Sequence, residues 1–287
     1  MRGLFMLCAG ALFACSANAQ LYGVDFDTGR LFRVNPANAA LTLIGNTNQT
    51  GLGDLQRAPN GNYYTFTTGA SAALYTVNVA NANVTAVGGG FGLSFVFEGA
   101  LAFGPTGTAY ATNAGEAANP NLFTINLTSG AATAGPVIGA FAHDINGMVW
   151  FNNKLYGIDR EINGILSFDP ATGNATQERI YNAAGGEPLL GEVGGMTMDQ
   201  SGTVYFCTAG TNAVLSGDNA LYTLNMTTFA ATKIGNFDAA TINGTGISGL
   251  ATATPAPEPA TIAVLLIGAG AISGRRLARR FGKGAAS

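Results

Sequence analysis

The sequence is poor in charged residues, which make up only 10% of its 287 positions, and it contains one histidine, one tryptophan and three cysteines. A hydrophobic content of 47% is far above that of intrinsically disordered chains, which excludes disorder as the general state. Strong helix formers are few, whereas 41 glycines and many threonines and asparagines favour strands and turns. The composition therefore predicts an all-β protein.

The shortage of catalytic residue types narrows the chemistry that this chain can perform. His143 is the only histidine, and Cys207 is the only cysteine after residue 19, so no disulfide can form within the body. The sequence has no H-E-x-x-H, P-loop or G-x-S-x-G motif. His143 and Asp144 are neighbours in sequence, an arrangement that rarely brings a catalytic pair face to face. These absences favour a protein that is not an enzyme.

Charge is distributed unevenly along the chain. Residues 20–254 carry 15 acidic and 7 basic side chains, so this body is clearly acidic. The segment after residue 274 has no acid and contains Arg275, Arg276, Arg279, Arg280 and Lys283. An acidic body without a basic stripe argues against a nucleic-acid partner.

The N-terminus has the three parts of a secretory signal peptide. A positive start at Arg2 is followed by a short apolar core and an A-x-A site, which predicts removal of residues 1–19 by cleavage between Ala19 and Gln20. The alternative is a lipoprotein signal ending at Cys15, although Phe13 is bulky for that motif. Either interpretation predicts export through the general secretory route.

The C-terminus has the features of a second targeting signal. Residues 254–260 form a linker that contains Pro257, Glu258 and Pro259, and residues 261–274 form an apolar segment that we expect to be a transmembrane helix. The segment is shorter than the about 20 residues of a comfortable bilayer span, and snorkelling of the arginines that follow helps it to span. Residues 275–287 form a basic tail, whose membrane-flanking arginines favour the cytoplasmic side. The alternative is an ordinary membrane anchor with an incidental Pro-Glu-Pro sequence.

The Pro-Glu-Pro motif, the apolar run and the arginine cluster together resemble the PEP-CTERM sorting signal. The resemblance covers about the last 30 residues. It implies recognition by an exosortase near the motif, anchoring in the inner membrane before processing, and a Gram-negative host that makes exopolysaccharide. The same kind of tail is also labelled an ice-binding protein C-terminal domain, a label that describes the tail and not the body.

The body, residues 20–253, repeats a hairpin phrase five times. Each copy is a strand of alternating apolar residues, a turn led by Asn or Asp, and a strand rich in Thr and Val. The copies lie at 31–45, 74–88, 122–139, 165–181 and 221–235. They align at Phe32, Tyr75, Phe123, Leu166 and Tyr222. We expect these aligned side chains to fill cores between repeats.

A second phrase, again strand, tight turn and strand, precedes four of these hairpins, at 53–66, 99–112, 147–158 and 195–207. The first unit lacks it, and the missing piece appears at the far end as 246–254. The sequence therefore predicts a β-propeller of about five four-stranded blades, closed by pairing of the last strand with the first blade. A sixth degenerate blade, an open β-solenoid and a two-sheet sandwich are the alternatives.

Four acidic residues precede or begin the innermost strands of the predicted blades: Asp54, Glu98, Asp144 and Glu192. Carboxylates near one axis repel each other unless a cation offsets them, and oxygen ligands suit a hard cation such as Ca²⁺. The sequence thus offers these residues as a candidate channel ligand site, with solvated loop carboxylates as the alternative. No other cofactor is predicted.

These features favour an exported surface or matrix protein with a non-enzymatic binding or structural propeller, whose partner would be exopolysaccharide or another envelope glycan. The alternative is a metal-dependent lactonase- or lyase-like propeller enzyme. A weaker alternative is ice binding, for which the clustered threonines of the body are too few and too local.

Overall fold

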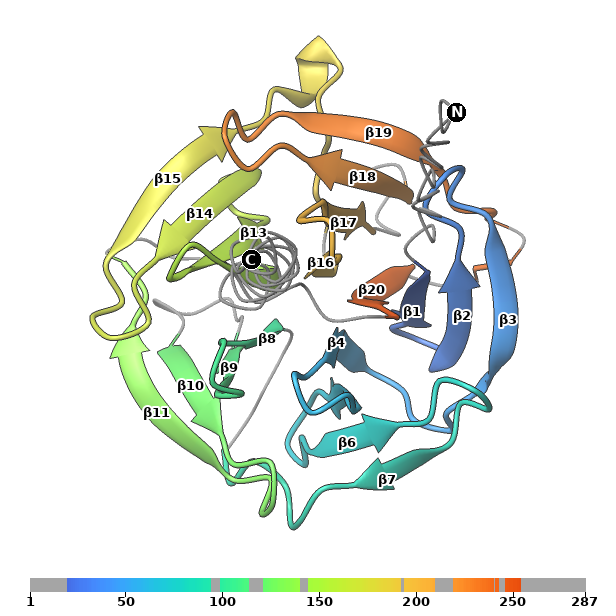
Figure 1. Cartoon of the computed structure of the whole chain (residues 1–287), viewed down its shortest axis with the longest axis vertical. Coiled ribbons are helices and arrows are strands. Elements are labelled where there is room, and N and C mark those ends of the chain that lie inside the picture. Colours follow the sequence, from blue (N-terminus) through green and yellow to red (C-terminus); the bar gives the residue numbers. More distant parts are fainter. Residues whose placement is uncertain are drawn as a thin grey trace, which may run out of the picture.

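The computed structural model describes residues 20–93, 99–113, 121–139, 144–191, 194–209, 219–239, 241–242 and 246–253. These residues form five four-stranded antiparallel sheets arranged around one axis, a five-bladed β-propeller (Figure 1). The predicted signal peptide, linker, apolar helix and basic tail lie outside the described residues. Within the described residues, no helix has the length and apolar character needed to cross a membrane.

Each blade is written below from its inner strand to its outer strand. Blade 1 contains β20 (Ile247–Thr252), β1 (Leu21–Asp25), β2 (Arg30–Val34) and β3 (Leu41–Asn46). Blade 2 contains β4 (Leu52–Arg57), β5 (Tyr63–Thr67), β6 (Leu74–Val77) and β7 (Val84–Ala86). Blade 3 contains β8 (Leu101–Phe103), β9 (Ala109–Thr112), β10 (Asn121–Ile125) and β11 (Ala132–Val137). Blade 4 contains β12 (Ile145–Phe151), β13 (Lys154–Asp159), β14 (Gly164–Phe168) and β15 (Ala175–Ile180). Blade 5 contains β16 (Met196–Met198), β17 (Val204–Thr208), β18 (Ala220–Leu224) and β19 (Ala231–Asn236).

The predicted closure is confirmed. Strand β20 pairs antiparallel with β1, so the end of the body supplies the inner strand of the first blade. This pairing joins Gly23 to Leu250 and Leu21 to Thr252. The described sheets are five, not six, and they form neither a solenoid nor a sandwich.

The strand registers show which residues are equivalent in the five blades. Phe32, Tyr75, Phe123, Leu166 and Tyr222 each occupy the same place on the third strand. Each of these residues pairs with one residue on the second strand, which pairs in turn with one residue on the inner strand. These inner residues are Leu250, Leu55, Leu101, Met148 and Met196.

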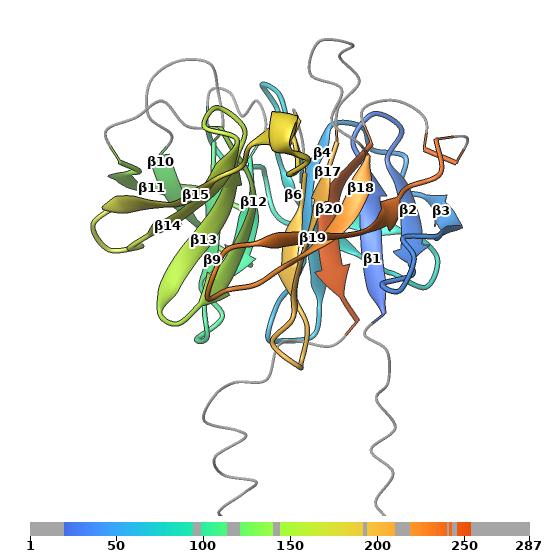
Figure 2. The ribbon, with the colours of Figure 1, turned by 90° about the horizontal axis from the view of Figure 1, so that it is seen from above.

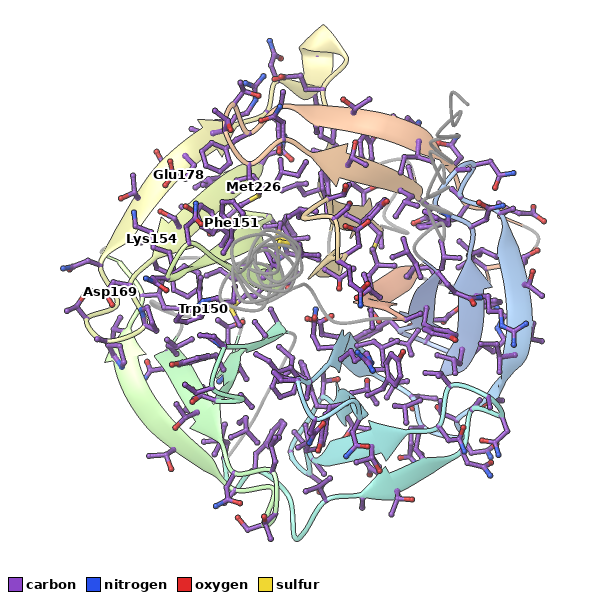
Figure 3. All side chains as sticks on the ribbon, viewed as in Figure 1. Trp150, Phe151, Lys154, Asp169, Glu178 and Met226 are labelled. Carbon is purple, nitrogen blue, oxygen red and sulfur yellow. The ribbon has the colours of Figure 1, made fainter. Side chains whose placement is uncertain are left out.

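Apolar side chains gather in five clusters, one between each pair of neighbouring blades. Four of the five aligned residues are buried in them, as expected, whereas Tyr75 remains partly exposed. Trp150 and Phe151 show how one inner strand serves two clusters (Figure 3). Trp150 stacks on Tyr110 of blade 3, and Phe151 packs on the cluster shared with blade 5. This alternation follows from the two-residue period of a strand.

The outer hairpins share one turn. In each, the side chain of the leading Asn or Asp accepts backbone N–H groups two or three residues further on, as short polar side chains do in turns. The leading residues are Asn35, Asn78, Asn126, Asp169 and Asn225. The same chemistry explains Asp25 and Asp159, whose carboxylates accept N–H groups in the turns after β1 and β13.

The two faces of the disc differ. One face carries the tight turns after the inner and third strands, together with the start of β1 and the end of β20 (Figure 2). The opposite face carries the turns after the second strands and the longer connections between blades, including the short 3₁₀ helix η1 (Ala183–Gly185). We call these the terminal face and the loop face.

Candidate functional site

The inner strands pack backbone against backbone near the axis. The residue before each inner equivalent is Gly249, Asp54, Ala100, Gly147 or Gly195. A Cβ at Gly249 would overlap the backbone of Asp54 and Leu55, and one at Gly195 would overlap that of Gly249 and Leu250. At this level, therefore, the close approach of the strands leaves no room for larger side chains at these glycines.

Asp54 is fully buried in this ring. Its Oδ1 accepts the N–H of Leu55 at 2.7 Å, and its Oδ2 accepts the N–H of Leu101 from blade 3 at 2.9 Å. Leu250 of blade 1 contributes a further backbone hydrogen bond. The Nε2 atom of Gln56 lies 3.5 and 3.4 Å from the two oxygens and donates to the carbonyl of Met196 in blade 5 at 2.6 Å. Asp54 thus links the inner strands of blades 1, 2 and 3, and Gln56 reaches across the axis to blade 5.

Burial and hydrogen bonding act in opposite directions on Asp54. Burial raises the pKa of Asp54 well above its ordinary value, while the hydrogen bonds from Leu101, Leu55, Gln56 and Leu250 lower it. The nearby thiol of Cys207 is also fully buried, and burial together with Asp54 raises the pKa of Cys207 to about 12. Cys207 therefore lacks the exposure and the lowered pKa that a reactive thiol needs.

Asp144 occupies the loop face of blade 4, just before β12. Its Oδ2 pairs with a guanidinium nitrogen of Arg160 at 2.8 Å, and its backbone carbonyl accepts the N–H of Arg160 at 3.0 Å. The residue is only 5% exposed, and Oδ1 has no hydrogen-bond partner among the described residues. Burial, with smaller effects of Asp159 and Glu161, raises the pKa of Asp144 to about 6, against the lowering effects of Arg160 and of a side-chain hydrogen bond with Asn146. A buried carboxylate with a raised pKa is a common feature of functional sites.

Asp54 and Asp144, the two of the four predicted carboxylates that the structure places, do not lie at the same height along the axis. Asp54 lies one residue before its inner equivalent Leu55, whereas Asp144 lies four residues before Met148. Three residues of strand correspond to about 10 Å along the axis. Glu98 and Glu192 lie outside the described residues, as does His143.

The carboxylates that the structure places have other partners: backbone N–H groups around Asp54 and a guanidinium beside Asp144. In the part of the chain that the structure describes, no three His, Cys, Asp or Glu side chains lie close enough to hold a metal ion. A channel calcium site therefore remains a prediction.

The ring was not apparent from the sequence, because the four second phrases begin at Gly53, Gly99, Gly147 and Gly195. The strand registers shift this correspondence by one residue: Asp54 and Ala100 are equivalent to Gly147 and Gly195, and Gly53 is not. With this shift, Asp54 occupies a position that is glycine or alanine in the other four blades. That exception was a signal in the sequence.

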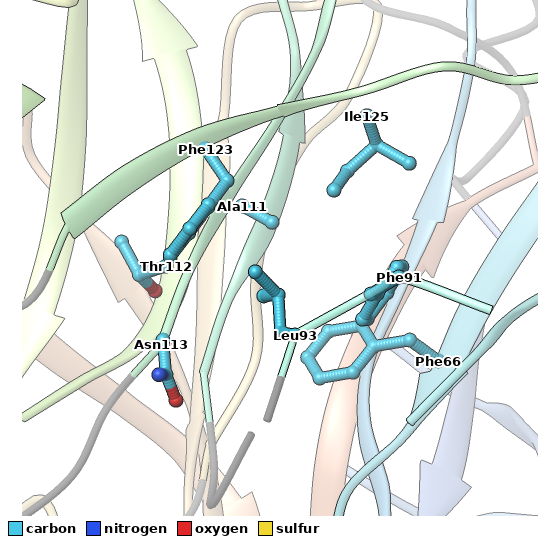
Figure 4. A pocket seen from close by; sticks show the side chains of 8 residues that line it. All are labelled: Phe66, Phe91, Leu93, Ala111, Thr112, Asn113, Phe123 and Ile125. Carbon is cyan, nitrogen blue, oxygen red and sulfur yellow. The ribbon is translucent and has the colours of Figure 1, made fainter. Parts of the chain in front are cut away.

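An apolar recess lies between blades 2 and 3 (Figure 4). Its lining residues are Phe66, Phe91, Leu93, Ala111, Thr112, Asn113, Phe123 and Ile125. The Thr112 hydroxyl accepts the N–H of Ala100 and donates to the carbonyl of Ile145. The recess therefore offers apolar surface and little polar chemistry.

No protein-family model matches the chain, and no curated protein matches it. Among solved structures, a chain in the crystal structure of a nidogen/laminin complex matches with a TM-score of 0.52 and 12% identity, over 83% of this chain and 100% of that one. A protein of unknown function from Bacteroides caccae matches with a TM-score of 0.41 and 10% identity, over 80% of this chain and 76% of that one. Another, from Bacteroides thetaiotaomicron VPI-5482, matches with a TM-score of 0.47 and 11% identity, over 75% and 64%. The first likeness is to the propeller fold alone.

Proposed function

We propose that this chain is an exported protein sorted to the cell surface or the extracellular matrix, where its propeller acts as a non-enzymatic binding or structural module. The observation that carries the proposal is the position of the two ends of the body. The N–H of Ala253 donates to the carbonyl of Gln20 at 2.7 Å, so both ends lie together on the terminal face. A tail attached there leaves the loop face directed away from the point of attachment.

The loop face supports a binding role because polar groups lie there at the start of an inner strand. Asp144 and Arg160 pair with each other, and a carboxylate and a guanidinium together can accept from and donate to the hydroxyls of a sugar. The acidic body fits a neutral or hydroxyl-rich ligand better than nucleic acid. We therefore propose an exopolysaccharide or another envelope glycan as the partner. The nidogen/laminin likeness supports only the propeller fold.

Sorting is proposed to depend on the tail. The resemblance of Pro257, Glu258 and Pro259 with the segments that follow supports an exosortase as the processing partner and the inner membrane as the first site of attachment. In a host that makes an exosortase, wild-type chain should move from the membrane fraction to the surface or medium. The Glu258→Gln variant should accumulate in the membrane. Equal release of both would refute a role for the motif.

Binding is tested with the mature chain and size-fractionated host exopolysaccharide, by isothermal titration calorimetry. Arg160→Gln and Asp144→Asn should each weaken binding at least about tenfold, because each removes one of the two charged groups proposed to hydrogen-bond the glycan. Arg33→Gln, a change at an exposed arginine of β2, is the matched control and should bind normally. Equal affinity in all variants would place the ligand elsewhere.

A metal-dependent lactonase or lyase is the second candidate, favoured by the buried Oδ1 of Asp144. It requires bound metal. Native mass spectrometry and thermal melts before and after chelation distinguish the two proposals. The binding module should melt at the same temperature with and without chelator. One calcium ion per chain that disappears in Asp144→Asn would instead favour the enzyme.

A further inference from the structure

The axis of the propeller gathers backbone N–H groups from different blades. Leu55, Leu101 and Leu250 are equivalent residues of three inner strands, and the N–H of each bonds to the same carboxylate. Gln56 adds a side-chain amide directed at the same two oxygens. Four hydrogen-bond donors therefore converge on the carboxyl group of Asp54.

Three other inner strands approach the next blade in the same way, through a glycine at the position equivalent to Asp54. A Cβ at Gly249 would lie against the N atom of Leu55, and one at Gly195 would lie against the N atom of Leu250. A Cβ at Gly147 would lie 2.8 Å from the N atom of Met196. Gly249, Gly195, Gly147 and Asp54 thus each lie against a backbone N atom of the next blade's inner strand. Of these four residues, only Asp54 carries a hydrogen-bond acceptor in its side chain.

Converging backbone N–H groups make an anion-binding concavity. We infer that the axis of this propeller is an anion-binding site built from backbone N–H groups, and that the chain supplies its ligand, the carboxylate of Asp54. The chemical class of ligand is a small monovalent anion. With glycine at residue 54, as at the equivalent Gly147, Gly195 and Gly249, the donors are left for an anion from solution.

Alternative explanations for a buried aspartate fit less well. Asp25 and Asp159 are also fully buried, but they accept N–H groups within their own turns. Asp54 instead bonds to blades that are far apart in sequence. Burial outweighs the N–H donors and keeps the pKa of Asp54 well above its ordinary value, so the site is identified by the geometry of the converging donors and not by the charge of Asp54. The test therefore removes the carboxyl group and supplies an anion.

The experiment uses the full mature chain in detergent, with wild type, Asp54→Gly and Asp27→Gly, whose side chain is exposed. Sodium bromide replaces sodium gluconate at constant ionic strength, and the melting temperature is measured. Asp54→Gly should melt below wild type in gluconate and regain about 5 °C or more in bromide, because an anion that binds only the folded state stabilises it. Wild type and Asp27→Gly should respond little.

The same bromide response in Asp54→Gly and Asp27→Gly would overturn the inference. If Asp54→Gly does not fold in gluconate, its folded fraction after dilution from urea is measured as bromide increases. Recovery of folded protein supports the site, and no recovery at high bromide overturns it. Asp54→Asn keeps the side-chain volume but directs an amide N–H at the ring. It should be destabilised without rescue, and rescue by bromide to the same extent as Asp54→Gly would also count against the inference.

Discussion

The N–H of Ala253 donates to the carbonyl of Gln20 at 2.7 Å, which ties the last described residue to the first. The bond continues the pairing of β20 with β1. Truncation after residue 245 should therefore leave β1 as an open edge and remove one wall of two inter-blade cores. We expect aggregated or unfolded protein by size-exclusion chromatography and circular dichroism. A chain ending at residue 253 is the control and should be folded and elute as a single species.

The glycines of the inner ring should tolerate no side chain. Gly249→Ala places a methyl group against the backbone of the neighbouring inner strand, which cannot move without separating two blades. We expect a loss of about 3 kcal/mol or more in the free energy of unfolding. Gly89→Ala is the matched control, because nothing lies within 4 Å of its Cβ. Urea denaturation compares the two, and a similar loss in both would contradict backbone packing at the axis.

Asp144 should make stability depend on pH. Its pKa is raised from 3.8 to about 6 in the folded protein, so the folded chain holds the proton more tightly than the unfolded chain does. Ionisation therefore costs stability. The contribution of Asp144 to the free energy of unfolding should fall by about 2 kcal/mol as the pH rises from about 4 to about 6 and then stay level.

The measurement is the difference between wild type and Asp144→Asn in urea melts over that pH range. Asp27→Asn controls for loss of an exposed carboxylate. A wild-type advantage that grows with pH through this window would show that the pair with Arg160 outweighs the burial of Asp144.

The thiol of Cys207 should be unreactive in the folded protein. Burial raises its pKa to about 12, so almost no thiolate exists at pH 8. In a chain that starts at residue 20, reaction with a disulfide reagent should proceed only as fast as the protein unfolds, and urea should accelerate it. Rapid reaction of folded protein would show that Cys207 is accessible.

The blades could be predicted from sequence because their signals are local. Asn35, Asn78 and Asn126 lead turns that begin at the same point of each repeat, and the alternation of apolar residues sets which side chains face a neighbouring blade. The closure could be predicted because the first repeat lacks a phrase that the end of the body supplies. Both arguments need only spacing and residue type.

The role of Asp54 could not be read in the same way, because it depends on contacts between residues far apart in sequence. Its N–H partners Leu101 and Leu250 come from two other blades, and no local pattern joins them. The ion pair between Asp144 and Arg160 likewise depends on the length of β12 and β13. The sequence singled out both carboxylates as candidate channel ligands, but it did not show what each one contacts.

Closure by β20 also determines the order in which the blades can complete their strand pairing. The first three strands of blade 1 are synthesised early, but its inner strand comes at the end of the body. Blades 2 to 5 can pair their own strands beforehand, and closing a loop that spans the whole body is the slowest contact by topology. If the chain is exported from its N-terminus, as proposed, the closing strand emerges immediately before the linker 254–260. Completion of the fold would then coincide with arrival of the tail.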